Sequence, residues 1–394
     1  MQFYKIKNIL VVALIAVINA LGYGIVIPVL YSYSRKYGLS DFENGLLFAI
    51  FSVCQFISTP LIGRMSDKYG RRPLLLISLI GTAASFFIMA FAPSAFFLFI
   101  ARALDGITAG NLPVAQAIIS DSTTAEDRTR GFGIIGASFG FGFVFGPAIS
   151  AFTVGISLVL PFIIAGVVSV LAVIFTFFYL SETNQHMGEV SHAKLFDFKK
   201  LYEALFRENI GPTLLITLFY FLSFSLFIYA FQPFSVKMLH LSANQISLLF
   251  MGMGVVGLFM QAFLTQRLAQ KFELKKLFTV GLLLVALSFF IEFMSGNLAL
   301  FATAIVILGI ANGIVQPLVN TILSRETDSK SQGTIMGLNG SYMSIGQIIG
   351  PILGGAIATL GISYPFLAGG AILFICVALS RKILRPTVAP ESAF

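Results

Sequence analysis

Long uncharged stretches, separated by short charged clusters, follow one another along the whole chain. A helix needs about 20 apolar residues to cross the hydrocarbon core of a membrane, and most of these stretches reach that length. Two of them, 131–181 and 331–380, can each hold two helices, with turns at 155–157 and 361–363. The pattern predicts twelve membrane-spanning helices, at 8–32, 43–63, 73–92, 95–120, 130–154, 158–180, 211–236, 244–268, 276–295, 298–323, 333–359 and 364–384.

The composition excludes a soluble globular protein. Of the 394 residues, 57% are apolar and 11% are Asp, Glu, Lys or Arg, whereas soluble domains carry about 25% charged residues. The two cysteines, Cys54 and Cys376, lie inside apolar stretches and exclude a disulfide scaffold. The three histidines, at 186, 192 and 240, lack the spacing of metal ligands. We therefore expect neither a metal site nor a cofactor.

The positions of the basic residues indicate how the chain crosses the membrane. Most of the 25 Lys and Arg residues fall on one side of the predicted membrane, in alternate loops and at both termini. The other side holds Arg35, Lys36 and Lys237, and Arg102 falls inside a span. Because basic residues concentrate in cytoplasmic loops, both termini are expected in the cytoplasm. The net charge of +8 reflects this topology, and no nucleic-acid partner is expected.

The two halves of the sequence repeat each other. Five positions recur 204 residues later: Gly133, Gly136, Gly142, Gly146 and Pro147 match Gly337, Gly340, Gly346, Gly350 and Pro351. Parallel repeats of this kind place a substrate site near the membrane midplane. We expect an N-terminal six-helix bundle at 1–181, a cytoplasmic connector with an amphipathic helix at 182–210, and a C-terminal six-helix bundle at 211–394.

The most specific motif is GRMSDKYGRRP, residues 63–73, between the second and third spans. Gly63 would allow a close approach of helices. Asp67 would sit at a helix N-terminus, and Arg71 and Arg72 could reach carboxylates or lipid phosphates. The motif resembles the signature loop of the major facilitator superfamily. That resemblance implies that Arg71 pairs with Asp121, and it assigns a gating role to Gly63, Asp67, Gly70, Arg71, Arg72 and Asp121.

Residues 142–147, GFVFGP, form a second motif. Glycines four residues apart allow backbone-to-backbone helix contact, and a proline inside a helix bends it. We expect a helix-packing hinge at Gly142, Gly146 and Pro147, repeated at Gly346, Gly350 and Pro351. The motif also resembles the antiporter signature of the same superfamily, which implies export.

Arg102 and Asp105 lie three residues apart inside the predicted fourth span. Such residues share one helix face, and charges at membrane depth are usually paired and functional. The resemblance implies a proton relay at Arg102, so we expect proton coupling through Asp105 and Arg102. The alternative is an ion pair that only orders the helix. Glu292, near the outer end of the ninth span, is expected to snorkel to the interface.

Nearly the whole chain resembles the tetracycline-efflux-like branch of the twelve-span drug:proton antiporters, through the ARALDGITAG segment and residues 133–143. That branch has acidic residues where this chain has Asn19 and Ser85, and near Val285. A strongly cationic drug is therefore not the expected substrate. The candidate pocket combines aromatic and amide side chains: Asn19, Tyr23, Gln55, Tyr220, Phe224, Tyr229, Gln232, Asn312, Gln316 and Asn339.

The resulting prediction is an all-α membrane protein with twelve transmembrane helices in two pseudo-symmetric six-helix bundles, the major facilitator fold. We expect a proton-coupled exporter of small amphiphilic molecules, of the multidrug type, monomeric, surrounded by lipid in a bacterial inner membrane. Uptake of a small neutral metabolite is the alternative. An enzyme is not expected, because no catalytic constellation falls inside a span, and neither a filter loop nor a ring of charges indicates a channel.

Overall fold

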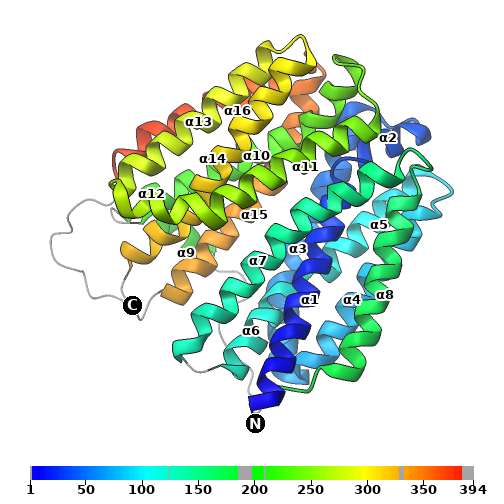
Figure 1. The fold of residues 1–394 in the computed structure, drawn as a ribbon, viewed down its shortest axis with the longest axis vertical. Coiled ribbons are helices and arrows are strands. Elements are labelled where there is room, and N and C mark those ends of the chain that lie inside the picture. Colours follow the sequence, from blue (N-terminus) through cyan, green and yellow to red (C-terminus); the bar gives the residue numbers. More distant parts are fainter. Residues whose placement is uncertain (1, 124, 185–197, 208–209, 328–331, 384–394) are drawn as a thin grey trace. The chain divides into compact units, whose positions relative to one another are not determined.

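The structure is a computed structural model and describes residues 2–123, 125–184, 198–207, 210–327 and 332–383. Every regular element among them is a helix. The first half contains α1 (Gln2–Val26), α2 (Leu30–Ser34), η1 (Arg35–Tyr37), α3 (Asp41–Tyr69), α4 (Arg71–Ala90), α5 (Ala95–Thr108), η2 (Ala109–Asn111), α6 (Leu112–Ser122), α7 (Ala125–Thr153) and α8 (Leu160–Tyr179). The remainder contains α9 (Phe198–Leu205), α10 (Gly211–Lys237), α11 (Ala243–Phe259), η3 (Met260–Leu264), α12 (Thr265–Lys271), α13 (Leu274–Met294), α14 (Leu298–Arg325), α15 (Gln332–Ala358) and α16 (Tyr364–Ser380) (Figure 1).

Each of the twelve predicted spans coincides with a helix or a broken helix, and the predicted fold class is confirmed. Among the described residues, nine helices are long and apolar enough to cross a membrane. A tenth span is broken, since Leu10–Val26 and Leu30–Tyr37 meet at 56°. Two shorter apolar helices, Gly140–Thr153 and Tyr364–Ser380, occupy the remaining two predicted positions.

The break in the first span has a local cause in the sequence. Pro28 has no backbone N–H to donate, and its ring disfavours helical backbone at the residue before it. The chain therefore forms a turn at 27–29 before α2 begins. After η1, Gly38 takes the left-handed conformation with φ 78°, and Ser40 starts α3 through a reciprocal capping box with Glu43.

The chain divides into two compact units, and each is described by itself. The first comprises Met1–Leu195 and Phe231–Gly254. Within it α1 packs along α7, and α4 packs along α8 (Figure 1). A core of aliphatic side chains fills the space around α1: Val11, Val12, Ile15, Ile18, Leu75, Leu79, Val114, Ile118 and Ile119.

Glycines set the spacing between α1 and α7. A side chain at Gly142 would overlap Ala20, and a Cβ at Gly146 would lie 2.8 Å from the Cα of Gly24. Gly24 itself faces Pro147, whose Cδ would lie 2.9 Å from a Cβ added there. The expected close packing at this motif is therefore present, and α7 remains helical through Pro147.

The C-terminal part of α10 and the start of α11 belong to the first unit. Gln232 accepts a hydrogen bond from the backbone N–H of Tyr31 at 3.0 Å. Lys237 pairs with Asp41 at 2.5 Å, and Asn244 donates to the carbonyl of Ala151. The division thus passes through α10, whereas the expected boundary at 182–210 follows the sequence repeat and stays a prediction.

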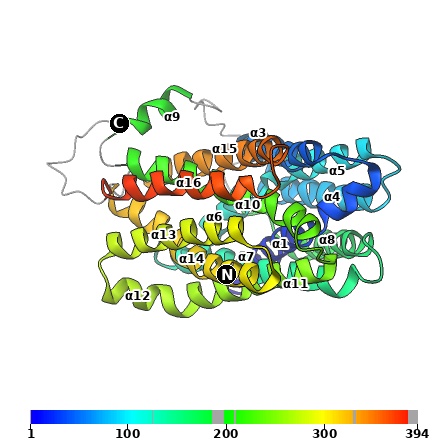
Figure 2. The same ribbon diagram turned by 90° about the horizontal axis from the view of Figure 1, so that it is seen from above.

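The second unit comprises Phe196–Ala230 and Val255–Phe394. Here α13 packs along both α14 and α16 (Figure 2). The repeated glycine motif on α15 also allows close helix packing, here against α10. A Cβ at Gly346 would lie 2.7 Å from the carbonyl oxygen of Leu218, and one at Gly350 would lie 2.5 Å from the Cβ of Ser225. Both halves therefore join two helices through a matching pair of glycines.

The expected amphipathic helix of the connector corresponds to α9. Ala204 is buried, while Tyr202 is 65% exposed on the other side. The hydroxyl of Tyr342 donates to the carbonyl of Leu201 at 2.6 Å, which attaches α9 to α15. Residues 185–197 of the connector, and with them His186 and His192, lie outside the described residues.

Candidate functional site

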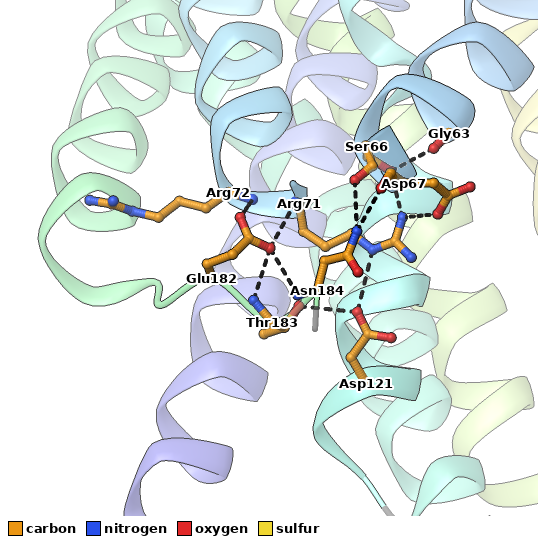
Figure 3. Close-up of polar contacts among 9 residues, drawn as sticks. All are labelled: Gly63, Ser66, Asp67, Arg71, Arg72, Asp121, Glu182, Thr183 and Asn184. Carbon is orange, nitrogen blue, oxygen red and sulfur yellow. Dashed lines mark hydrogen bonds and ion pairs between the residues drawn. The ribbon is translucent and has the colours of Figure 1, made fainter. Parts of the chain in front are cut away.

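Arg71 lies at the centre of the signature loop. Its Nη1 donates to the hydroxyl of Ser66 at 2.7 Å and to Oδ1 of Asp67 at 2.5 Å (Figure 3). Its Nε donates to Oδ2 of Asp121, at the end of α6, at 3.3 Å. The expected contact between Arg71 and Asp121 is therefore present. One guanidinium connects the end of α3, the start of α4 and the end of α6.

The sequence reasoning missed a further part of this cluster, the segment that follows α8. The carboxylate of Glu182 accepts hydrogen bonds from the backbone N–H groups of Arg71 at 2.9 Å and Arg72 at 3.0 Å (Figure 3). The first N–H groups of a helix have no partner within it and favour a negative charge. Glu182 therefore caps α4. No signal in a single sequence connects two positions 111 residues apart.

The next two residues extend the contact. Thr183 donates its hydroxyl to Oδ2 of Asp121 at 3.2 Å, and Asn184 donates its amide to the backbone carbonyl of Asp67 at 2.8 Å (Figure 3). Asn184 thus satisfies a carbonyl at the end of α3, where helices leave carbonyls without partners. We call residues 66–72, Asp121 and 182–184 the loop cluster.

Three expectations about the motif need correction. Asp67 lies in the last turn of α3 and not at a helix N-terminus, because the helix continues to Tyr69 and ends at Gly70, where φ is 101°. A Cβ at Gly63 would meet nothing within 4 Å, so no close helix approach requires this glycine. Arg72 donates to the carbonyl of Phe177 at 2.7 Å and forms no ion pair among the described residues, so the expected carboxylate contact is absent there, while contact with a lipid phosphate stays a prediction.

Arg102 and Asp105 form a buried ion pair on α5. Nη1 of Arg102 lies 3.1 Å from Oδ2 of Asp105, and the two residues are 3% and 8% exposed. The guanidinium also lies over the ring of Phe51, 4.3 Å from its centroid, and Nε donates to the carbonyl of Leu47 at 3.4 Å. The arginine is thus held by a carboxylate, an aromatic face and a backbone oxygen.

Three of the predicted pocket residues lie on the helices that surround this pair. Tyr23 meets Phe51 edge to face, with ring centroids 5.4 Å apart. Asn19 lies one turn before Tyr23 on the same face of α1, and Gln55 lies one turn after Phe51 on the same face of α3. All three predicted residues are half-buried. Aromatic and amide groups therefore line the helix faces next to the ion pair.

A second group of predicted residues comes together in the other unit. The hydroxyl of Tyr220 on α10 donates to the side-chain oxygen of Asn312 on α14 at 2.5 Å, and Gln316 lies one turn after Asn312 on the same face of α14. Phe224 lies one turn further along α10, with its ring parallel to that of Tyr220. Asn339 accepts a hydrogen bond from Thr217 at 2.8 Å, one turn before Tyr220.

Two predicted pocket residues lie apart from these groups. Tyr229 is 1% exposed and packs against Gly354, where a Cβ would lie 2.7 Å from its ring. Gln232 binds the backbone of Tyr31 in the first unit. Their polar residue types alone gave no indication that they pack between helices.

Glu292 was predicted to snorkel to the interface, and this prediction is wrong. Its exposed fraction is 0%, and it lies among the buried residues of α13. The reason is the packing of neighbouring helices, since α14 and α16 both pack along α13 and Tyr364 of α16 stacks on Phe293 at this end. A residue near a helix end can extend its side chain to the membrane interface only when no neighbouring helix covers that side of the helix.

The two clusters differ in the chemistry of their side chains. Among the described residues, no group of three or more His, Cys, Asp or Glu side chains could hold a metal ion. The N-terminal cluster joins one acid, one base and aromatic rings, while the C-terminal cluster joins a phenol and carboxamides. Such surfaces suit a molecule with both apolar and hydrogen-bonding groups.

Comparisons with known proteins agree with this chemistry. Residues 12–234 and 213–394 each match the family profile described as Major Facilitator Superfamily. The chain is 32% identical over 391 residues to the class C tetracycline resistance protein of Escherichia coli, covering 96% of this chain and 98% of that one. It is 28% identical to multidrug resistance protein 2 of Bacillus subtilis (strain 168), covering 95% and 94%. The fold matches that of a bacterial homologue of the human lysosomal transporter Spinster, inward-facing and occupied, with a TM-score of 0.78 and 19% identity over 98% of this chain and 99% of that one.

Proposed function

Because the chain belongs to the Major Facilitator Superfamily, we propose that it is an antiporter that exports small amphiphilic molecules in exchange for protons, by alternating access. The observation that carries this proposal is the buried pair of Arg102 and Asp105 beside aromatic residues. A charge at membrane depth is costly and is usually retained for a function. The pair supplies the group that binds the proton.

The proton step takes place on Asp105. In its ionised form Asp105 is compensated by Arg102 at 3.1 Å. Protonation removes that attraction and leaves Arg102 held by the ring of Phe51 and the carbonyl of Leu47. The change in charge alters the packing of α5 against α3, and this change is what couples the proton to the movement of substrate.

The substrate meets aromatic and amide groups in each half. In the N-terminal half these are Tyr23, Asn19 and Gln55, and in the C-terminal half they are Tyr220, Phe224, Asn312 and Gln316. Ser85 and Val285 are buried and neutral where the tetracycline-efflux-like branch carries acids. With these acids missing, a neutral or weakly charged amphiphile fits the site better than a strong cation.

The loop cluster serves as a latch in this proposal. It connects α3, α4 and α6 through Arg71 and stabilises one of the two conformations of the transport cycle. The basic residues around it support a position on the cytoplasmic side of a bacterial inner membrane, with both termini on that side.

The test is transport by purified protein in liposomes with an imposed pH gradient. We expect the wild type to concentrate a neutral amphiphilic probe such as radiolabelled chloramphenicol when the gradient is present, and to accept it from the cytoplasmic side. Asp105→Asn should abolish uphill transport and leave probe binding and downhill exchange. The control is Glu273→Gln, which removes an exposed carboxylate.

Two results would overturn the proposal. If Asp105→Asn still concentrates the probe with the wild-type pH profile, the proton does not use Asp105. If wild-type protein accumulates neutral metabolites in right-side-out vesicles and exports none of a panel of amphiphiles, the protein is an importer.

A further inference from the structure

A second acidic residue is buried, in the half of the chain that does not contain Asp105. Glu292 on α13 is 0% exposed, and among the described residues neither of its carboxyl oxygens has a hydrogen-bond partner. Buried polar side chains nearly always have partners, so one without any requires an explanation. The antiport proposal above gives this residue no role.

The hydroxyl groups nearest to Glu292 along α13 are engaged elsewhere. Ser288 donates to the carbonyl of Val285 at 2.7 Å. Ser295 donates to the backbone carbonyl of Glu292 itself, also at 2.7 Å. Neither hydroxyl can therefore donate to the carboxyl group of Glu292 in this arrangement.

The surroundings of this end of α13 are aromatic. Phe289, one turn before Glu292 on the same face, has its ring centroid 6.1 Å from that of Phe227 and 6.5 Å from that of Phe366. Phe301, in the first turn of α14, lies 6.3 Å from Phe366. All four rings are fully buried. Such surroundings offer no compensation for a negative charge.

No ion pair compensates the charge either, in the part of the chain that the structure describes. Lys275 lies seventeen positions before Glu292, or about 25 Å along the helix, and binds the carbonyl of Arg381. Tyr364, the titratable residue at the near end of α16, stacks on Phe293. The other titratable or charged side chains of the helices packed against α13 are Tyr220, Tyr229 and Lys237 of α10, Arg267 and Lys271 of α12, Lys276 of α13, Arg325 of α14 and Cys376 of α16. None of the basic residues forms an ion pair with Glu292 among the described residues.

We propose that Glu292 is a proton-binding site of the C-terminal half. A carboxylate without donors or a countercharge is far more costly to bury than a neutral carboxyl group. In this arrangement of α13, α14 and α16, Glu292 carries a proton. Asp105, by contrast, has the guanidinium of Arg102 at 3.1 Å as a countercharge, which favours its ionised form. The two halves thus hold buried acids in contrasting surroundings.

The position of Glu292 provides a route for the proton. The residue lies in the last turn of α13, which ends at Met294, and the exposed residues Met294 and Gly296 follow. Opening of this single turn would hydrate the carboxyl group and allow the proton to leave. The proton occupancy of Glu292 stands independently of the antiport proposal, while its use in transport rests on that proposal.

The test is infrared difference spectroscopy of the full-length protein in lipid nanodiscs, on raising the pH from neutral to alkaline. We expect a carbonyl stretching band of a protonated carboxyl group that shifts in D2O and is lost in Glu292→Gln. Asp105→Asn and the exposed control Glu273→Gln should keep this band. Glu292→Asp should move the band without removing it, which provides the test if the glutamine variant does not accumulate.

The proposal is overturned if the wild type shows no protonated carboxyl group at neutral pH, or if Glu292→Gln keeps the band unchanged. Transport of a neutral amphiphile such as radiolabelled chloramphenicol in proteoliposomes then separates the two proposals. A band assigned to Glu292 together with no proton-driven movement of any amphiphile would keep the proton site and refute the antiporter. Proton-driven transport in Glu292→Gln with the wild-type pH profile would refute a role of this site in coupling.

Discussion

Nζ of Lys237 lies 2.5 Å from Oδ2 of Asp41, and the hydroxyl of Tyr31 donates to the other carboxylate oxygen of Asp41 at 2.8 Å. These two contacts connect the end of α10 with the start of α3 and with α2. Gln232, one turn and a half earlier on α10, adds the hydrogen bond from the backbone of Tyr31. The group stabilises the conformation in which these three helices meet.

Asp41→Asn is expected to weaken this conformation modestly. The Asp41 and Lys237 side chains are 16% and 38% exposed, and exposed ion pairs contribute about 0.2–1 kcal/mol. The helices at this end should therefore separate more often, by up to about fivefold. Distances between spin labels on α3 and α10 measure the change. The exchanged pair, Asp41→Lys with Lys237→Asp, should restore the wild-type distances, and Lys36→Gln serves as the control. Unchanged distances in Asp41→Asn would show that the contact has no such effect.

Asp67→Asn and Asp121→Asn are expected to act through the same arginine. Each removes one carboxylate from Arg71, so the effects of the two changes should not add. Transport should fall several-fold in each single variant, while expression and membrane insertion stay near normal. Initial rates in vesicles, normalised to the amount of inserted protein, provide the measurement. Wild-type turnover in both variants would show that the loop acts only as a topological signal.

Glu182→Ala is expected to destabilise the start of α4. Loss of a helix cap costs about 0.5–2 kcal/mol, and here two N–H groups lose their acceptor. Hydrogen exchange at 71–74 should become faster, while exchange in the middle of α4 stays unchanged. Glu182→Gln keeps the acceptor oxygen and should give an intermediate result. Equal protection of 71–74 in all three proteins would contradict the capping role.

Gly142→Ala and Gly63→Ala form a matched pair. A methyl group at Gly142 would overlap Ala20, whereas one at Gly63 meets open space. Overpacking costs about 1–3 kcal/mol, so the melting temperature of Gly142→Ala should fall. Gly63→Ala should be neutral or slightly stabilising, because alanine favours a helix interior. Scanning fluorimetry of both variants in the same detergent measures the difference, and equal melting temperatures would refute the close contact.

The helices and their number followed from the sequence, because water-free surroundings require long apolar segments. The contact of Arg71 with Asp121 was also predictable, through its motif. Burial of Glu292 was not, since it depends on α14 and α16 both covering this end of α13. The cap by Glu182 depends on where the chain runs after α8. Periodicity and composition describe single helices. The burial of Glu292 and the cap by Glu182 could not be predicted from them, because both depend on contacts between separate segments.

Backbone contact between α1 and α7 has a consequence for how the protein can deform. At Gly24, Gly142 and Gly146 the two helices approach so closely that an added Cβ would overlap the facing helix, so at these positions little room is left for one helix to slide along the other. We therefore expect the two helices to move together as a rigid pair. Bending is then expected at the nearest break in either helix. For α1 the nearest break is the 56° bend before α2. The turn at Pro28 is therefore where the first half is expected to bend.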